Sequence, residues 1–310
     1  MPLRWRPRPS CPEMLAFRRS FEMPEIGVLY TVAEYAHPAF RVRVERGRGV
    51  ETDEALMFPA CAWSGYGDRP RLDVVLQGQV RDVENGVTRW LGRSHFAIGR
   101  ALDSLYMRTQ GPEVVLLSVE WSLGSLGTSA PVGLPSGSLS PRDAATLAAS
   151  VDALLTPAHE ATAAGRIGDV VALLRSAGVP FDAWRARDLV APVPSSLQRV
   201  ADAVGRNLSR LGDSPGMAEL ERELGVSRRR VAQLVGELAG RYGLNGTDWR
   251  TMRDRWRVLA SLLAMSNPAA RTEVVARAVG YGSANALCHA YREANLPSPG
   301  LVRGALARLA

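Results

Sequence analysis

The stretch TEVVARAVGYGSANALCHAYREANLPSP, from Thr272 to Pro299, decides the fold of the C-terminal part of this 310-residue chain. It predicts a short amphipathic helix, a turn at Gly280 and a second helix from Ser283 to about Glu293. The apolar residues of the first of these helices are Val274, Val275, Ala278 and Val279.

The spacing around Gly280 predicts that the two helices pack against each other. Ala276 lies four residues before the glycine, where crossing helices approach closely and a small side chain is needed. Tyr281 follows the turn as a core residue, and Leu287 and Tyr291, spaced i and i+4, turn one edge of the second helix inward. The residues left on the opposite face are Ala284, Asn285, Cys288 and His289. We therefore expect a helix-turn-helix motif whose second helix is free to enter a DNA major groove.

The same pattern occurs upstream, in MAELERELGVSRRRVAQLVGEL from Met217 to Leu238. Gly225 makes the turn, and Ser227 is placed as the N-cap of the second helix. The apolar residues that pack this motif are Leu220, Leu224, Val226, Val231, Leu234, Val235 and Leu238. Glu221 takes the position equivalent to Ala276 and is larger and charged, so the packing of this motif must differ. The residues left outward are Arg228, Arg229, Ala232 and Gln233.

Two such motifs, joined by a long helix from Trp249 to about Met265, resemble the C-terminal DNA-binding domain of the AraC family of bacterial transcription regulators. The run V-x-x-A-V-G-Y-x-S-x-x-x-L-x-x-x-Y-R followed by L-P-S-P carries the resemblance, which covers residues 195–310. The first motif and the joining helix match more loosely, and the segment Gly240–Thr247 differs from the family. The resemblance implies an α+β protein with an all-α double helix-turn-helix domain after a sensor domain. The motifs span residues 217–238 and 272–293.

Two recognition helices held by one rigid helix would enter successive major grooves about 34 Å apart on one face of the duplex. We expect Arg228, Arg229 and Gln233 to read or grip the first groove. Asn285 and His289 would meet the second groove, with Asn285 suited to adenine. Phosphate contacts that set the register are expected from Ser227, Ser283 and Arg292. For each arginine the alternative is a solvated helix face.

The charge distribution favours DNA as the partner. The chain has no lysine, so all 38 basic residues are arginine. From Ser195 onward there are 17 Arg against 10 Asp plus Glu, a net charge of +7, whereas 21 Arg face 21 acids before it. Codon usage could explain the absence of lysine, but it does not explain why the net charge is segregated.

Composition narrows the class of protein. The chain is 46% hydrophobic and 22% charged, which is ordinary for a soluble globular protein with two domains. No apolar run approaches the length of a membrane span, and no signal peptide is predicted, so we expect a cytoplasmic protein. Cys11, Cys61 and Cys288 are too widely spaced for a zinc site or a disulfide framework. Residues 1–20, rich in arginine and proline, are expected to form a flexible basic arm.

Residues 21–140 are expected to form one domain, and from Ile26 to about Trp121 they show the two-residue alternation of β-strands. In one example Val42 and Val44 alternate with Arg41 and Arg43. Asn85-Gly86 is a strong hairpin signal, and residues 113–121 form a more buried strand. We expect a small β-barrel or jelly roll, in agreement with the cupin-like sensor domain of the resembled family.

A binding cavity is a better expectation for this barrel than catalysis. The candidate effector-binding residues are Tyr35, His37, Trp63, Trp90 and His95, and the alternative for each is core packing. No catalytic residues, metal ligands or cofactor motifs occur at a recognisable spacing, so an enzyme is not expected. The alternative functions are a small-molecule enzyme or metal-free ligand-binding protein built on the barrel, and a nonspecific architectural DNA binder.

Residues 141–190 predict two amphipathic helices after a linker rich in Gly, Ser and Pro. Their apolar stripes are expected either to pack on their own domain or to pair two subunits. Residues 191–196 (APVPSS) are then the hinge to the DNA-binding half. The expected partners are double-stranded operator DNA, a small-molecule effector, a second copy of the chain and RNA polymerase. The effector, the operator and the direction of regulation are left open by the sequence.

Overall fold

In the computed structural model, the described residues are 15–37, 40–51, 70–84, 87–100, 108–121, 136–156, 160–178, 195–243 and 246–307. The strands are β1 (Leu15–Met23), β2 (Val28–His37), β3 (Phe40–Arg48), β4 (Pro70–Glu84), β5 (Val87–Leu91), β6 (His95–Arg100), β7 (Arg108–Trp121) and β8 (Ser136–Ser138). The helices after them are α2 (Pro141–Leu155), α3 (Glu160–Ser176), α5 (Ser195–Leu208), α6 (Met217–Leu224), α7 (Arg228–Tyr242), α8 (Trp249–Met265), α9 (Thr272–Ala278), α10 (Ala284–Glu293) and α11 (Pro299–Ala307). Short 3-10 turns η1 (Pro24–Ile26) and η3 (Leu211–Asp213) complete the order.

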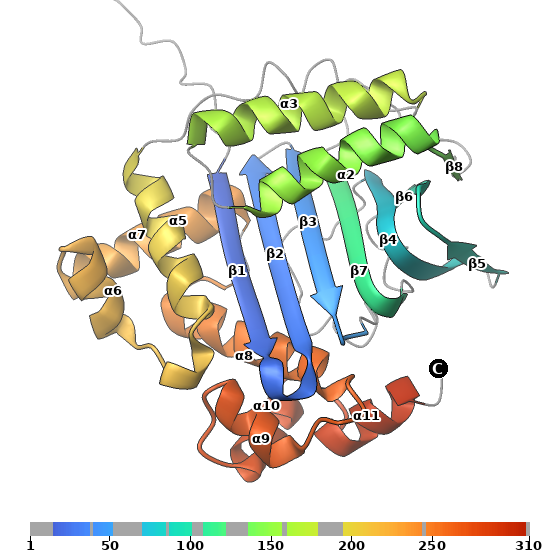
Figure 1. The fold of residues 1–310 in the computed structure, drawn as a ribbon. Helices are drawn as coiled ribbons and strands as arrows, with labels where there is room; N and C mark the ends of the chain where they lie inside the picture. The colour runs from blue at the N-terminus through green and yellow to red at the C-terminus, as the bar shows by residue number, and fades with distance from the viewer. Residues whose placement is uncertain are drawn as a thin grey trace, which may run out of the picture.

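All strand pairs in the described sheet are antiparallel, in the order β1-β2-β3-β7-β4-β6-β8, with β5 paired to β4. The predicted hairpin is confirmed, because Glu84 pairs with Val87 across residues 85–86. The α+β class, with strands first and helices after, is likewise confirmed. Among the described strands, the sheet is curved, and no pairing between β1 and β8 joins its two ends (Figure 1).

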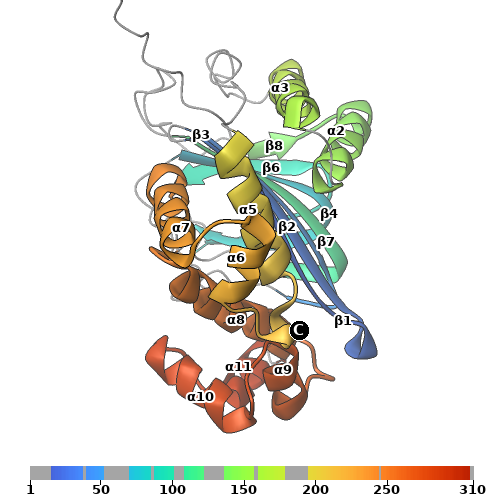
Figure 2. The same cartoon turned by 90° about the vertical axis from the view of Figure 1, so that its left-hand side faces the viewer.

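The sheet lies between two helical layers (Figure 2). One face packs on α2 and α3, whose buried residues include Leu147, Val151, Val170 and Leu174. These residues belong to the apolar stripes of residues 141–190, which were expected either to pack on their own domain or to pair two subunits. In this structure they are buried in their own domain.

The other layer consists of the C-terminal helices, which share one apolar core with β1 and β2. Helix α5 lies along β1 (Figure 1). There the amide of Gln198 exchanges two hydrogen bonds with the backbone of Ala16, at 3.0 and 2.8 Å. Gly205 allows this approach, since a Cβ there would lie 2.1 Å from the carbonyl oxygen of Arg18. The side chain of Gln198 therefore covers part of the open edge of the sheet.

Residues 15–20 belong to β1, where Arg19 is buried, so the basic arm expected at 1–20 is corrected at this end. Residues 1–14 lie outside the described residues, as do most of the predicted linker and residues 191–194 of the predicted hinge.

Candidate nucleic-acid interface

The first motif consists of α6 and α7. Gly225 ends α6 in the left-handed conformation, at φ 68°, and its amide donates to the carbonyl oxygen of Glu221 at 2.9 Å. The predicted apolar stripe of α7 is buried: Val231, Leu234, Val235 and Leu238. Ser227 occupies the N-cap position, but its hydroxyl makes no capping hydrogen bond. Glu221 is half-buried at the edge of the helix crossing, so the motif closes despite the larger side chain.

The outward face of α7 is exposed to solvent. Its exposed residues include Arg228, Arg229, Arg230 and Gln233, and Ser227 just before the helix is also exposed. Three arginines in the first turn place their charge at the end of the helix that enters a groove in helix-turn-helix proteins. The structure thus brings together all the residues predicted to meet the first groove.

The second motif consists of α9 and α10. Ala276, Leu287 and Tyr291 are completely buried, as their spacing predicts. Val274 departs from the prediction because its side chain is 37% exposed on α9. The hydroxyl of Ser283 caps α10 by accepting from the amide of Ala286 at 3.2 Å.

An additional bond in the second motif joins its two helices directly. The carboxylate of Glu273 on α9 accepts from the amide of Ala284 at 3.0 Å and from Arg277 at 3.1 Å. No local sequence pattern predicts the bond between Glu273 and Ala284, because the two residues belong to different helices. It joins the N-terminus of α10 to α9, and the predicted DNA-contacting residues Asn285, His289 and Arg292 of α10 are exposed.

Helix α8 runs between the two motifs. Asp248 caps it by accepting from the amide of Thr251 at 2.9 Å, and this backbone bond lowers the pKa of the Asp248 carboxyl. Further along α8, the hydroxyl of Ser261 donates to the hydroxyl of Tyr291 on α10 at 3.1 Å. Burial raises the pKa of the Tyr291 hydroxyl. Helices α7 and α10 lie toward the same side of the molecule, away from α2 and α3, with α8 between them (Figure 2).

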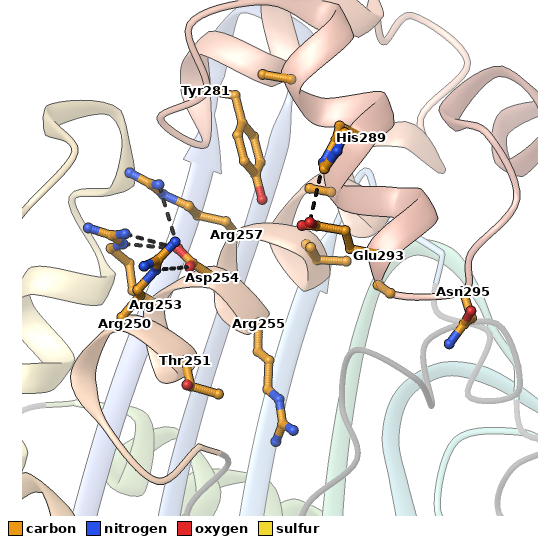
Figure 3. A pocket seen from close by; sticks show the side chains of 14 residues that line it. Arg250, Thr251, Arg253, Asp254, Arg255, Arg257, Tyr281, His289, Glu293 and Asn295 are labelled. Carbon is orange, nitrogen blue, oxygen red and sulfur yellow. Dashed lines mark hydrogen bonds and ion pairs between the residues drawn. The ribbon is translucent and has the colours of Figure 1, made fainter.

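A groove of about 900 Å³ separates the first half of α8 from α10 (Figure 3). Four arginines line it together with the predicted reading residue His289: Arg250, Arg253, Arg255 and Arg257. The carboxylate of Asp254 lies between three of them, at 3.6 Å from Arg250, 3.0 Å from Arg253 and 3.7 Å from Arg257. Burial, and then the charge of Arg253, lower the pKa of Arg257. The guanidinium of Arg257 also lies 5.5 Å from the ring centre of Tyr281, whose pKa is raised by burial to about 12.

The sheet contacts the first recognition helix through a buried arginine. Arg41 on β3 donates to the carbonyl oxygens of Tyr242 and Gly243, at 2.9 and 3.4 Å, at the C-terminal end of α7. A cation at this end of a helix satisfies free carbonyl groups and matches the helix dipole. The alternation in β3 placed Arg41 on a polar face but could not reveal that α7 covers it.

The same face of the sheet holds a buried network of charged side chains. Arg19 pairs with Glu34 at 3.0 Å, and Arg43 pairs with Glu45 at 2.8 Å. The Arg19 guanidinium also lies 4.6 Å from the ring centre of Trp256 on α8. The sheet therefore contacts both α7 and α8.

The predicted effector-binding residues are not brought together. Tyr35 is buried under α2, where its hydroxyl donates to the carbonyl of Leu154 at 2.7 Å and accepts from Arg18 at 2.7 Å. Trp90 is 50% exposed on β5, which lies at the opposite end of the sheet from β2 (Figure 1). His95 is exposed on β6. Trp63 and the side chain of His37 lie outside the described residues.

Within the described ranges, no three or more His, Cys, Asp or Glu side chains form a group that could hold a metal ion. The helices of that same part include none that is both long and apolar enough to cross a membrane.

No family model and no curated protein matches the sequence. Among solved structures, ToxT from Vibrio cholerae O395 matches over 85% of this chain and 97% of its own, at 12% identity and a TM-score of 0.33. Wild-type ToxT of strain SCE256 with a bound unsaturated fatty acid matches over 86% and 96%, at 12% identity and a TM-score of 0.33. The AraC-like transcriptional activator CuxR matches over 69% and 76%, at 16% identity and a TM-score of 0.28.

Proposed function

We propose that this protein is a sequence-specific DNA-binding transcription regulator of the AraC type. One observation carries the proposal. The helices α7 and α10, which both carry exposed polar side chains, lie toward the same side of the molecule with α8 between them. Helices arranged in this way can enter successive major grooves of one duplex without bending the protein.

The roles of the exposed residues follow from their chemistry. Arg229 carries a planar fork that can pair with both acceptors on a guanine edge, and Asn285 can pair bidentately with adenine. Arg228, Gln233 and His289 complete the reading faces. Ser227, Ser283 and Arg292 hold phosphates, although Ser283 does so while its hydroxyl also caps α10. The net charge of +7 after residue 194 supplies the attraction to the phosphate backbone.

The test uses the full chain, because α5 shares its core with β1 and a fragment starting at Ser195 would expose that face. Operator DNA is obtained by repeated selection from a random duplex pool. Arg229→Ala should weaken binding to the selected duplex by about 1–3 kcal/mol and should weaken binding to an unrelated duplex much less. Arg142→Ala, an exposed arginine on α2 at the far side of the molecule, is the control.

Two results would contradict this role. An equal loss on both duplexes would make Arg229 a phosphate contact only. If the wild-type protein selects no sequence, and its affinity for every duplex falls equally steeply with salt, the protein is a nonspecific architectural binder.

We propose further that a small molecule bound by the N-terminal domain controls DNA binding, at a place other than the five residues expected from the sequence. The support is a hollow of about 360 Å³ between α2 and the sheet, lined by both charged and apolar side chains. Its lining residues are Arg46, Leu76, Gln77, Arg93, Val115, Ala148 and Asp152. Such a mixture suits a small polar ligand.

A metabolite library screened by thermal shift tests this site. Any compound that stabilises the protein and changes its DNA affinity should lose both effects in Ala148→Phe, which fills the hollow. Ala149→Phe places the same ring on the exposed side of α2 and should change nothing. Equal responses in both variants would contradict the site. We also propose that this protein, as a regulator of this type, pairs with a second copy of the chain and contacts RNA polymerase.

A further inference from the structure

A large groove lies between α8 and α10, and the two proposed recognition helices alone do not explain it (Figure 3). Its walls carry four arginines against two acids, Asp254 and Glu293. Asp254 is shared among three of the arginines, so the groove keeps an excess of positive charge. An oligoanion is the partner that such a surface fits best.

The arginines of the groove differ in how firmly they are held. The side chains of Arg253 and Arg257 are only 19% and 9% exposed. Arg253 is held further by a hydrogen bond from its guanidinium to the carbonyl of Pro215 at 3.3 Å. Arg250 is 86% exposed and Arg255 is also exposed, so both can reach a ligand at the rim. Arg253 and Arg257 thus hold their charge inside the groove, and Arg250 and Arg255 carry theirs at its rim.

The position of the groove identifies the anion. His289 lines it from α10, so DNA that meets His289 passes directly over the rim. When two recognition helices occupy successive major grooves, the minor groove and its two phosphate strands must cross the surface between them. The element between α7 and α10 is α8 (Figure 2).

We infer that this groove receives the sugar-phosphate strand that borders the second major groove. This inference rests on the proposed DNA binding. Arg250 and Arg255 contact phosphates at the rim, while Arg253 and Arg257 keep the groove positive from within. Helix α8 is then a contact surface for DNA as well as the rod that joins the two motifs.

The double variant Arg250→Ala, Arg255→Ala tests the inference in the full chain. Both side chains are exposed, so the variant should fold, which a thermal melt verifies. Its affinity for the selected duplex and for an unrelated duplex is measured from 50 to 300 mM KCl. Over this range the release of counterions from DNA makes the affinity depend strongly on salt. Each lost phosphate contact should lower the slope of log K against log salt by about 0.9, so a loss of about 2 is expected on both duplexes.

The matched control is Arg142→Ala, Arg175→Ala, which removes two exposed arginines from α2 and α3 on the opposite side. Charges so far from the DNA are screened at these salt concentrations, so the slope should stay as in the wild type. If the wild type selects a sequence but the rim variant keeps its slope, or loses no more than the control, the inference is wrong while the proposed function stands. If the wild type selects no sequence, the proposed function fails first.

Discussion

The two helix-turn-helix units of this chain are stabilised in different ways. The second unit is packed through its own residues: Ala276, Leu287 and Tyr291 are completely buried, and Glu273 joins α9 to the start of α10. In the first unit, Leu220 is the one completely buried residue of α6, and the end of α7 is held by Arg41 from the sheet. Both units share one apolar core with β1 and β2, but the hydrogen bonds from Arg41 join the end of α7 directly to the sheet. A helix held from another part of the chain can move with that part.

The largest difference in unfolding free energy between the units is expected at the equivalent positions Ala276 and Glu221. Ala276→Glu would bury a carboxylate without a partner at a fully buried site and should cost roughly 3–5 kcal/mol of unfolding free energy. The reverse change at the equivalent position, Glu221→Ala, should stay within about 0.5 kcal/mol because that side chain is only half-buried. Chemical denaturation measures both. Similar costs at the two positions would remove the contrast.

The turn glycines should differ next. Gly280 has φ 82°, and a Cβ there would lie 2.3 Å from the carbonyl oxygen of Leu211. Gly280→Ala should therefore cost roughly 2–5 kcal/mol, from backbone strain and overpacking together. Gly225 has φ 68° with nothing within 4 Å of the same position, so Gly225→Ala should cost about 1–2 kcal/mol. Thermal melts of the two variants measure this difference. Equal melting midpoints for Gly280→Ala and Gly225→Ala would contradict the difference in packing.

The dependence of the first unit on the sheet can be broken at Arg41. Arg41→Met removes the hydrogen bonds to the end of α7 and should loosen that helix by about 1.5–3 kcal/mol. Hydrogen exchange should become faster in α7 and stay unchanged in α10. Arg48→Met, an exposed change on the same strand, is the control. Equal acceleration in both recognition helices would show that the units are not held separately.

The smallest effect is expected at the joint between the units, where Asp248 caps α8. Asp248→Ala should cost about 1 kcal/mol at neutral pH. The folded state lowers the pKa of this carboxyl, so its contribution is present above the ordinary value of about 4 and is lost as the pH falls through the folded pKa. The stability difference between variant and wild type should therefore disappear in acid. A difference that persists there would mean that the charge is not the cause.

Much of the C-terminal half could be predicted, because its decisive residues act within a few positions of each other. Ala276, Gly280, Leu287 and Tyr291 lie in one local pattern, and the structure places the last two in the core as the spacing requires. Val274 is exposed, and Leu224, Val226, Ala278 and Tyr281 are only partly buried, since short helices and turns pack only part of their apolar surface.

The N-terminal half was less predictable, because its contacts join residues far apart in sequence. Alternation in β3 correctly separates Val42 from Arg41 and Arg43, but all three are buried. Charged residues are expected on a solvent face, and only the covering helices and the opposite charges beside them make burial tolerable. The expected effector residues failed for a related reason: Tyr35 and Trp90 are both aromatic, but β2 and β5, which carry them, are separated by β3, β7 and β4 in the sheet.

The most direct test of the central claim is the sequence that the wild-type protein selects from a random duplex pool. Two units on one face of α8 predict a motif of two blocks, with centres separated by one helical turn, about 10 base pairs. Arg229→Ala should weaken the base preference in one block of the selected motif, and Asn285→Ala should weaken it in the other. A single block, or no preferred sequence at all, would contradict the account.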